Sequence, residues 1–164
     1  MLLAVDTNLA LDLAEDVADA IDALSVIQQR IKRVRLIVSP TVCLELAYLA
    51  EFAEEAPLRA TASKALRSLA ARWDIQPLNL IPAGHGIVEI VGERIRAEGL
   101  LPEEEVHDAF ILAESALLGA SMLLTSDAHL RGIDYERLAL LLNDFDVAAP
   151  IIATPREIVR KFCR

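Results

Sequence analysis

The sequence contains few aromatic residues, and too few basic residues to balance its acids. Aromatics make up 4% of the 164 residues, so Leu, Ile, Val and Ala must fill the interior. At 54% hydrophobic and 25% charged, the chain has the apolar content that an intrinsically disordered protein lacks. Its 16 Lys and Arg against 25 Asp and Glu give a net charge of −9. This charge argues against tight, non-specific binding to a phosphate backbone.

Disulfides, a leader sequence and a membrane span are also missing. The two cysteines, Cys43 and Cys163, make no disulfide framework and favour a reduced cytoplasmic setting. Residues 1–5 have no basic flank and meet Asp6 at once, which is not the pattern of a signal peptide. The best uncharged run, 115–126, is shorter than the roughly 20 apolar residues of a membrane span. We therefore expect a soluble, cytoplasmic protein.

Short apolar runs alternate with helical patterns along the chain. Four runs are typical of buried strands: 2–5, 35–38, 121–124 and 151–153. Segment 73–78 suits a fifth, short strand that Pro77 limits. Helical periodicity or capping residues mark the stretches 16–32, 39–52, 58–72, 87–97, 102–115, 134–142 and the segment after Thr154.

This alternation predicts an α/β fold in which right-handed crossovers build a parallel sheet covered on both faces. We expect three layers, α/β/α, with a central parallel sheet of four or five strands. The length is close to that of one domain, and no linker composition interrupts it, so residues 1–164 are predicted to form a single domain.

Four acidic residues fall where this fold would bring them together. Asp6 directly follows the first strand, and Asp127 comes three residues after the run 121–124. Glu45 and Asp108 each share a helix face with apolar neighbours three or four residues away, where a carboxylate is costly unless something compensates it. In an open parallel sheet, sites form at the carboxyl ends of the strands, so all four carboxylates can point into one crevice.

Clustered carboxylates repel one another, and a hard divalent cation such as Mg²⁺ or Mn²⁺ removes that repulsion. A site made of carboxylates suits phosphodiester cleavage, in which one or two metal ions activate water and neutralise the scissile phosphate. The residue pattern does not choose between one ion and two.

The stretches around these acids also resemble those of a known family. They are Val5-Asp6-Thr7-Asn8, Ser39-Pro40-Thr41-Val42-Cys43-Leu44-Glu45-Leu46, Val106-His107-Asp108-Ala109-Phe110-Ile111-Leu112-Ala113 and Leu123-Leu124-Thr125-Ser126-Asp127, followed by 151–157. In this order and spacing they resemble the PIN-domain ribonuclease family, whose members include the VapC-type toxins. The resemblance spans nearly the whole chain.

The resemblance implies a PIN-like domain with metal-dependent endoribonuclease activity on RNA, and a Mg²⁺ or Mn²⁺ cofactor. It implies an acidic quartet that is catalytic and binds the metal, supported by hydrogen bonds from two polar residues. The quartet is Asp6, Glu45, Asp108 and Asp127, and the supporting residues are Asn8 and Thr125. It further implies a homodimer and, for a toxin, an antitoxin protein whose segment occupies the active-site groove.

Other interpretations of the same residues stay open. The chain could be a catalytically silent PIN-like binding or adapter module, or a metal-dependent phosphatase for a small substrate. Each acid alone could be an ordinary helix cap or rim residue. Zinc is disfavoured because His85, His107 and His129 lack the spacing of zinc ligands, although His107 is expected beside the site.

Two basic clusters could guide a phosphate backbone toward the crevice, or could simply be solvated charge beside acidic helices. The first is Arg30, Lys32, Arg33 and Arg35, and the second is Arg59, Lys64, Arg67 and Arg72.

Overall fold

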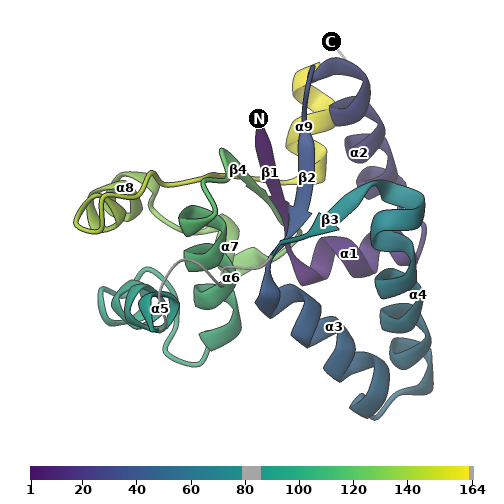
Figure 1. Ribbon diagram of the computed structural model, residues 1–164, viewed down its shortest axis with the longest axis horizontal. Coiled ribbons are helices and arrows are strands. Elements are labelled where there is room, and N and C mark those ends of the chain that lie inside the picture. The colour runs from purple at the N-terminus through teal and green to yellow at the C-terminus, as the bar shows by residue number, and fades with distance from the viewer. Residues whose placement is uncertain (79–85, 163–164) are drawn as a thin grey trace.

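The computed structural model describes residues 1–78 and 86–162 (Figure 1). In these ranges, the strands form one five-stranded sheet in the order β3-β2-β1-β4-β5, and every neighbouring pair is parallel. The strands are β1 (Leu2–Val5), β2 (Arg35–Val38), β3 (Ile75–Pro77), β4 (Met122–Leu124) and β5 (Ile151–Ala153). The predicted parallel sheet is confirmed, including its fifth strand, which is the edge strand that ends in Pro77.

The central strand is apolar along its whole length because both faces of the sheet are covered. Leu3, Ala4 and Val5 of β1 are all buried. Ala4 lies opposite Ile37 of β2 and Leu123 of β4, both of which are also buried. The short apolar runs in the sequence are therefore the core of the sheet.

Helices lie on both sides of this sheet (Figure 1). Figure 1 shows α1, α2, α4 and α9 on one side and α5, α6 and α8 on the other, while α3 extends away from the carboxyl edge. The helices are α1 (Thr7–Ala14), α2 (Ala18–Arg30), α3 (Pro40–Phe52), α4 (Ala56–Trp73), α5 (Ile87–Ala97), α6 (Val106–Leu117), α7 (Ala128–Arg131), α8 (Tyr135–Asn143) and α9 (Pro155–Phe162). The expected three-layer α/β/α arrangement is confirmed.

Some local expectations were wrong. The acidic stretch 103–105 is not the first turn of a helix, because α6 begins at Val106 and Asp108 lies in its first turn. The place of Cys43 on its helix, nearly opposite Glu45, predicts a buried residue, but Cys43 is half-buried. This partial burial raises the pKa of its thiol, which makes it a poor nucleophile. Helices α1 and α7, which directly follow β1 and the loop after β4, were not expected from the sequence.

Helical spacing predicts an apolar stripe of Val17, Ile21, Leu24 and Ile31 on α2, and the structure differs from it. Val17, just before the helix, and Ile21 are 39% and 36% exposed. The buried residues are Ala20, Ala23 and Ile27, because the small alanines let α2 lie close against its neighbour α9.

None of the helices in the described ranges has the length and hydrophobicity that crossing a membrane requires.

Candidate metal centre

The strand order creates one crevice at the carboxyl edge of the sheet. From β1 the chain moves outward to β2, and from β4 it moves outward in the opposite direction to β5. In a doubly wound sheet, ligands bind where the order reverses, here between the carboxyl ends of β1 and β4. The backbone N–H of Asp6 donates to the carbonyl of Leu124 at 3.1 Å, which places the residues that follow the two strands side by side.

Asp6 is the most buried acid of this crevice, with 1% of its surface exposed. Its Oδ1 accepts a hydrogen bond from the backbone N–H of Leu9 at 2.7 Å and caps α1, while its Oδ2 accepts from the hydroxyl of Thr125. Burial raises the pKa of Asp6 to about 7, against the lowering effect of these two hydrogen bonds. The nearby charges of Asp108 and Asp127 raise it further.

Asp127 caps α7 in the same way. Its Oδ1 accepts from the backbone N–H groups of His129 and Leu130 at 2.7 and 3.1 Å, and its Oδ2 accepts from the amide of Asn8 at 3.4 Å. The hydroxyl of Thr125 accepts from the backbone N–H of Asp127 at 2.8 Å and therefore links the two aspartates. The structure thus places Asn8 and Thr125 against acids of the predicted quartet.

Asp108 faces several negative charges at once. Desolvation is the largest cause that raises its pKa to about 7, followed by the charges of Asp127, Glu105 and Glu45, while His129 lowers it. Because the charge of Asp108 also raises the pKa of Asp6, the other three predicted acids all lie within electrostatic reach of Asp108. The four acids come from the ends of β1 and β4 and from helices α3 and α6.

Glu45 is oriented by two neighbours. The hydroxyl of Thr7 donates to its Oε2, and Nδ1 of His107 lies 2.7 Å from its Oε1. His107 is therefore beside the site, as the sequence suggested. The apolar stripe expected around Glu45 is only partly buried: Val42 is buried, whereas Phe52 is 64% exposed.

Two residues outside the predicted set join the site. Glu105 and His129 lie close to Asp108. One possible metal-ligand atom from each of these three residues lies within 4.8 Å of the other two. The spacing between histidines in the sequence does not reveal this group, because its single histidine lies beside two acids and not beside a second histidine. Their positions next to the quartet, three residues before Asp108 and two after Asp127, were the available signal. His85 lies outside the described residues.

The first basic cluster lies away from the crevice, which favours its interpretation as solvated charge over that of guiding a phosphate backbone. Arg30, Lys32, Arg33 and Arg35 lie at the start of β2, at the amino edge of the sheet and opposite the carboxylates.

The second cluster, on α4, is largely engaged elsewhere. Lys64 and Arg72 both bind Asp16, at 2.8 and 3.0 Å, and lower its pKa. Arg59 donates to backbone carbonyls next to the start of its own helix. The acids of 12–22 form a run of charge that is typical of a solvated face. In the structure several of them make contacts instead, including one from the hydroxyl of Ser126 to Asp12.

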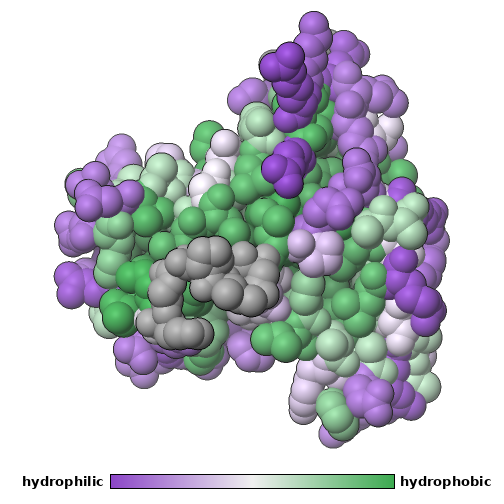
Figure 2. All heavy atoms as spheres, viewed as in Figure 1, coloured by the Kyte–Doolittle hydropathy of each residue, from purple (hydrophilic) through white to green (hydrophobic). Residues whose placement is uncertain are grey.

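An apolar groove of about 900 Å³ adjoins the crevice between α3 and α6. Its lining is Thr41, Leu44, Glu45, Ala47, Tyr48, Leu49, Phe52, Val106, His107 and Phe110. Leu44 and Tyr48 are 71% and 63% exposed, and Tyr48 packs against the Phe52 ring with centroids 5.2 Å apart. Figure 2 shows apolar side chains gathered over the sheet and continuing over α3. We call this surface the α3–α6 groove.

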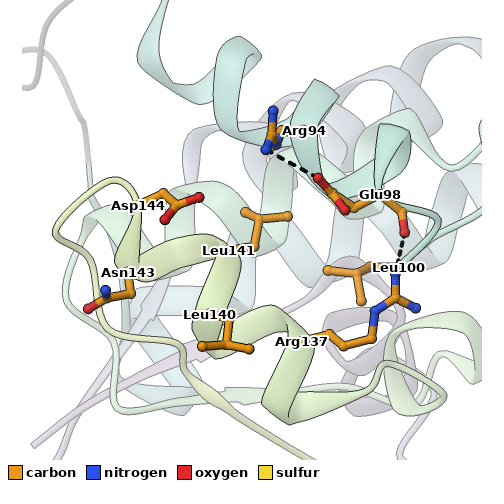
Figure 3. A pocket seen from close by; sticks show the side chains of 8 residues that line it. All are labelled: Arg94, Glu98, Leu100, Arg137, Leu140, Leu141, Asn143 and Asp144. Atoms are coloured by element: carbon orange, nitrogen blue, oxygen red, sulfur yellow. Dashed lines mark hydrogen bonds and ion pairs between the residues drawn. The ribbon is translucent and has the colours of Figure 1, made fainter.

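A further hollow, of about 340 Å³, lies between α5 and α8 (Figure 3). Arg94 pairs with Glu98 at 3.2 Å, and Arg137 donates to the Glu98 carbonyl at 2.6 Å. None of the four candidate carboxylates lines this hollow, and its two arginines are engaged within it. Its polar groups therefore form a local network between the two helices.

Comparisons with known proteins agree with this fold. No family model and no curated protein matches the chain. Among solved structures, the chain is similar to one of VapBC2 from Rickettsia felis bound to a DNA fragment from their promoter, with a TM-score of 0.62 and 14% identity over 94% of this chain and 98% of that one. It is also similar to one of VapBC-1 from nontypeable Haemophilus influenzae, with a TM-score of 0.57 and 15% identity over 95% and 99% of the two chains.

These similarities confirm the expected fold: a PIN-like α/β/α arrangement around one parallel sheet. At 14% and 15% identity, these similarities establish the fold alone. The observation that bears on function is the carboxylate crevice.

Proposed function

We propose that residues 1–164 form a single PIN-like domain that is a divalent-metal-dependent endoribonuclease. One observation carries this proposal. Four carboxylates from four separate parts of the chain meet at the carboxyl edge of the sheet, and two of them, Asp6 and Asp108, have their pKa raised to about 7. Burying these carboxylates and crowding them together costs stability, and it indicates a place where a cation belongs.

The donor set fits Mg²⁺ or Mn²⁺. Asp6, Asp108 and Asp127 supply carboxylate oxygens as metal ligands, and Glu45 is a further ligand or the residue that orients the attacking water. The bound ion would neutralise the scissile phosphate and lower the pKa of the water that attacks it.

The surrounding groups hold these carboxylates in place. Thr125 and the backbone N–H of Leu9 fix Asp6. Asn8 and the first turn of α7 fix Asp127. Each carboxylate keeps lone pairs for a second partner, because an ionised carboxylate accepts about four hydrogen bonds or metal contacts. The hydroxyl of Thr7 and the imidazole of His107 likewise fix Glu45 on the groove side of the crevice.

An RNA strand would reach this crevice along its Ser126 side. A hollow of about 530 Å³ there is lined by Ser126, Arg131 and Arg160, among others. Hydrogen bonds with Thr154 are the main cause that lowers the pKa of Glu157, and the charges of Arg131 and Arg160 add to it. Neither arginine forms a close ion pair in the described ranges, so their guanidinium groups are available to a phosphate backbone.

The proposal extends to a toxin that is silenced by an antitoxin and that forms a homodimer in the cytoplasm. The two similar structures are VapBC structures, and the α3–α6 groove is an exposed apolar surface that touches Glu45 and His107. Exposed apolar patches of this kind mark protein interfaces. An apolar partner segment in this groove would lie against the catalytic edge, which explains how one contact could both bind and inhibit.

Cleavage of a fluorescent, generic single-stranded RNA tests the activity. We expect cleavage with Mn²⁺, loss with EDTA and recovery when Mn²⁺ is returned. Asp127→Asn should lower the rate at least 100-fold because it removes a metal ligand. Asp134→Asn is the matched control, since Asp134 caps α8 through the same pair of backbone contacts but lies outside the carboxylate group.

Two results would redirect the proposal. A folded protein that binds Mn²⁺ but cleaves no RNA would support the silent adapter, for which the α3–α6 groove is the observation in favour. Hydrolysis of a generic phosphate ester without RNA cleavage would support the phosphatase. RNA cleavage that survives in Asp127→Asn would refute the assigned site.

A further inference from the structure

Glu114 is a buried acid that the proposed chemistry does not use. It lies on α6 with 5% of its surface exposed, and Asp6 is the one other buried acid in the described ranges. Its Oε2 accepts a hydrogen bond from the backbone N–H of Thr41 at 3.0 Å, and its Oε1 accepts one from the Thr41 hydroxyl at 3.0 Å. No lysine or arginine of residues 1–78 and 86–162 forms an ion pair with it. Burying a carboxyl group without a basic partner is costly, so its position needs an explanation.

The two hydrogen bonds cap α3 from a different helix. Thr41 lies in the first turn of α3, where a carboxylate also meets the positive end of the helix dipole. Ser39, at the N-cap of α3, makes no capping hydrogen bond, and its buried hydroxyl has no partner in the described residues. Serine is one of the preferred N-cap residues, so capping alone does not call for a carboxylate from another helix. What Glu114 adds is a polar link between α3 and α6.

A second polar link joins the same two helices at the crevice. Nδ1 of His107 on α6 lies 2.7 Å from Oε1 of Glu45 on α3. Glu45 comes four residues after Thr41, and His107 comes seven residues before Glu114, so the members of each pair share one face of their helix. Phe110 lies between His107 and Glu114 on α6, lines the α3–α6 groove and offers apolar contact alone. The two polar links therefore fix how α3 lies against α6.

We propose that Glu114 is a positioning residue that sets the place of Glu45 relative to Asp108. The inference deepens the proposed function and rests on it for the roles of these two acids. Glu45 lies about 6 Å along α3 from Thr41, and Asp108 lies about 9 Å along α6 from Glu114. Glu114 therefore acts through the two helices and does not touch the metal or the RNA.

Loss of the link at Thr41 would let α3 shift relative to α6. In the described ranges, the polar contact then left between the two helices is that of Glu45 with His107, and the His107 side chain is 66% exposed. The apolar groove residues around this contact set no fixed register, because dispersion and hydrophobic contacts are not directional. A displacement of about 1 Å at a reacting group can lower a rate by about 100-fold.

Steady-state cleavage of the fluorescent single-stranded RNA by the full chain, in saturating Mn²⁺, tests this role. We expect Glu114→Met, which removes both hydrogen bonds at similar size, to lower kcat by about 10- to 100-fold and to leave KM unchanged. Glu114→Gln should keep most of kcat, because its amide oxygen can accept from the Thr41 N–H and its amide group can donate to the hydroxyl. Leu138→Ala, in the buried face of α8, is the control for lost stability and should keep the wild-type kcat below its Tm.

A second measurement needs neither metal nor activity. In NMR spectra of the metal-free protein at one fixed pH, the ring resonance of His107 reports its contact with Glu45, and Glu45→Gln gives the reference for a changed contact. We expect Glu114→Met to move this resonance toward its position in Glu45→Gln. Glu114→Gln and Leu138→Ala should leave it in place.

Two results would overturn the proposal and leave Glu114 a helix cap only. They are a wild-type kcat in folded Glu114→Met and a His107 resonance that does not move in it. If Glu114→Met does not fold, Thr41→Val removes the hydroxyl bond alone and should show both effects more weakly, and the absence of either effect would count in the same way. A wild type that cleaves no RNA would refute the nuclease, whereas the His107 resonance would still decide whether Glu114 places Glu45.

Discussion

Replacing Asp6 by Asn should stabilise the metal-free protein at alkaline pH. Asp6 is almost fully buried, and its pKa in the folded protein is about 7 against 3.8 in the unfolded chain. The folded protein therefore holds a proton that the unfolded chain releases, and folding stability falls as the pH rises from about 4 to about 7. The full difference between the folded and unfolded pKa of Asp6 corresponds to a loss of about 4 kcal/mol of folding stability at pH 8. The Asp6→Asn variant avoids this loss because its amide carries no charge.

The geometry suggests that the substitution leaves the fold in place. The amide oxygen of Asn can accept from the backbone N–H of Leu9 as Asp6 does, and its amide group can donate to the Thr125 hydroxyl. The gain is thus at most about 4 kcal/mol, or on the order of 10 °C in Tm for a chain of this length.

Thermal unfolding in EDTA at pH 8 and at pH 4 measures the effect. We expect Asp6→Asn to melt above the wild type at pH 8, and the difference to shrink at pH 4, where the wild-type carboxyl is protonated in the folded protein. Mn²⁺ should raise the Tm of the wild type and have a smaller effect on the variant. An Asp6→Asn protein that melts below the wild type at pH 8 in EDTA would refute the reasoning, since the carboxylate would then be stabilised by its hydrogen bonds.

Three further predictions concern the packing and the surface. Glu114→Ala should cost about 3 kcal/mol in urea unfolding, because the buried Glu114 accepts both the backbone N–H and the hydroxyl of Thr41 at 3.0 Å, and an unchanged midpoint would contradict this. Gly92→Ala should cost about 1–3 kcal/mol, because an added Cβ would lie 2.6 Å from the Phe110 ring, and Phe110→Leu should restore part of the loss. Arg131→Gln should reduce the salt dependence of RNA binding, measured by fluorescence anisotropy, by a slope of about 1, and an unchanged slope would place the RNA elsewhere.

The sheet could be predicted from the sequence because four of its five strands are short apolar runs, each followed by a turn. Residues 2–5 and 35–38 are too short for helices, and all of them except Leu2 and Arg35 are buried in the structure, as in a sheet covered on both faces. The stripe of α2 could not be predicted in this way. Its buried residues include Ala20 and Ala23, whose small size becomes informative only once α9 is known to pack against α2.

Some residues of the candidate site could likewise be predicted from the sequence, and others could not. Asp6 and Asp127 could be found because the ends of parallel strands share one edge, and the strand order confirms that their strands are neighbours. Glu105 and His129 could not, because their approach depends on how the start of α6 faces α7, which no spacing within one helix encodes. The role of the basic cluster of 30–35 stayed open in the sequence because charge density does not say at which edge of the sheet it falls.

Crystals soaked in Mn²⁺ and measured at the manganese absorption edge test the central claim most directly. We predict an anomalous peak bound by oxygens of Asp6, Asp108 and Asp127, in the crevice between the ends of β1 and β4. Crystals of Asp6→Asn, soaked in the same way, should lose this peak or show it much reduced. A fully soaked wild-type crystal with no peak among these three carboxylates would contradict the account.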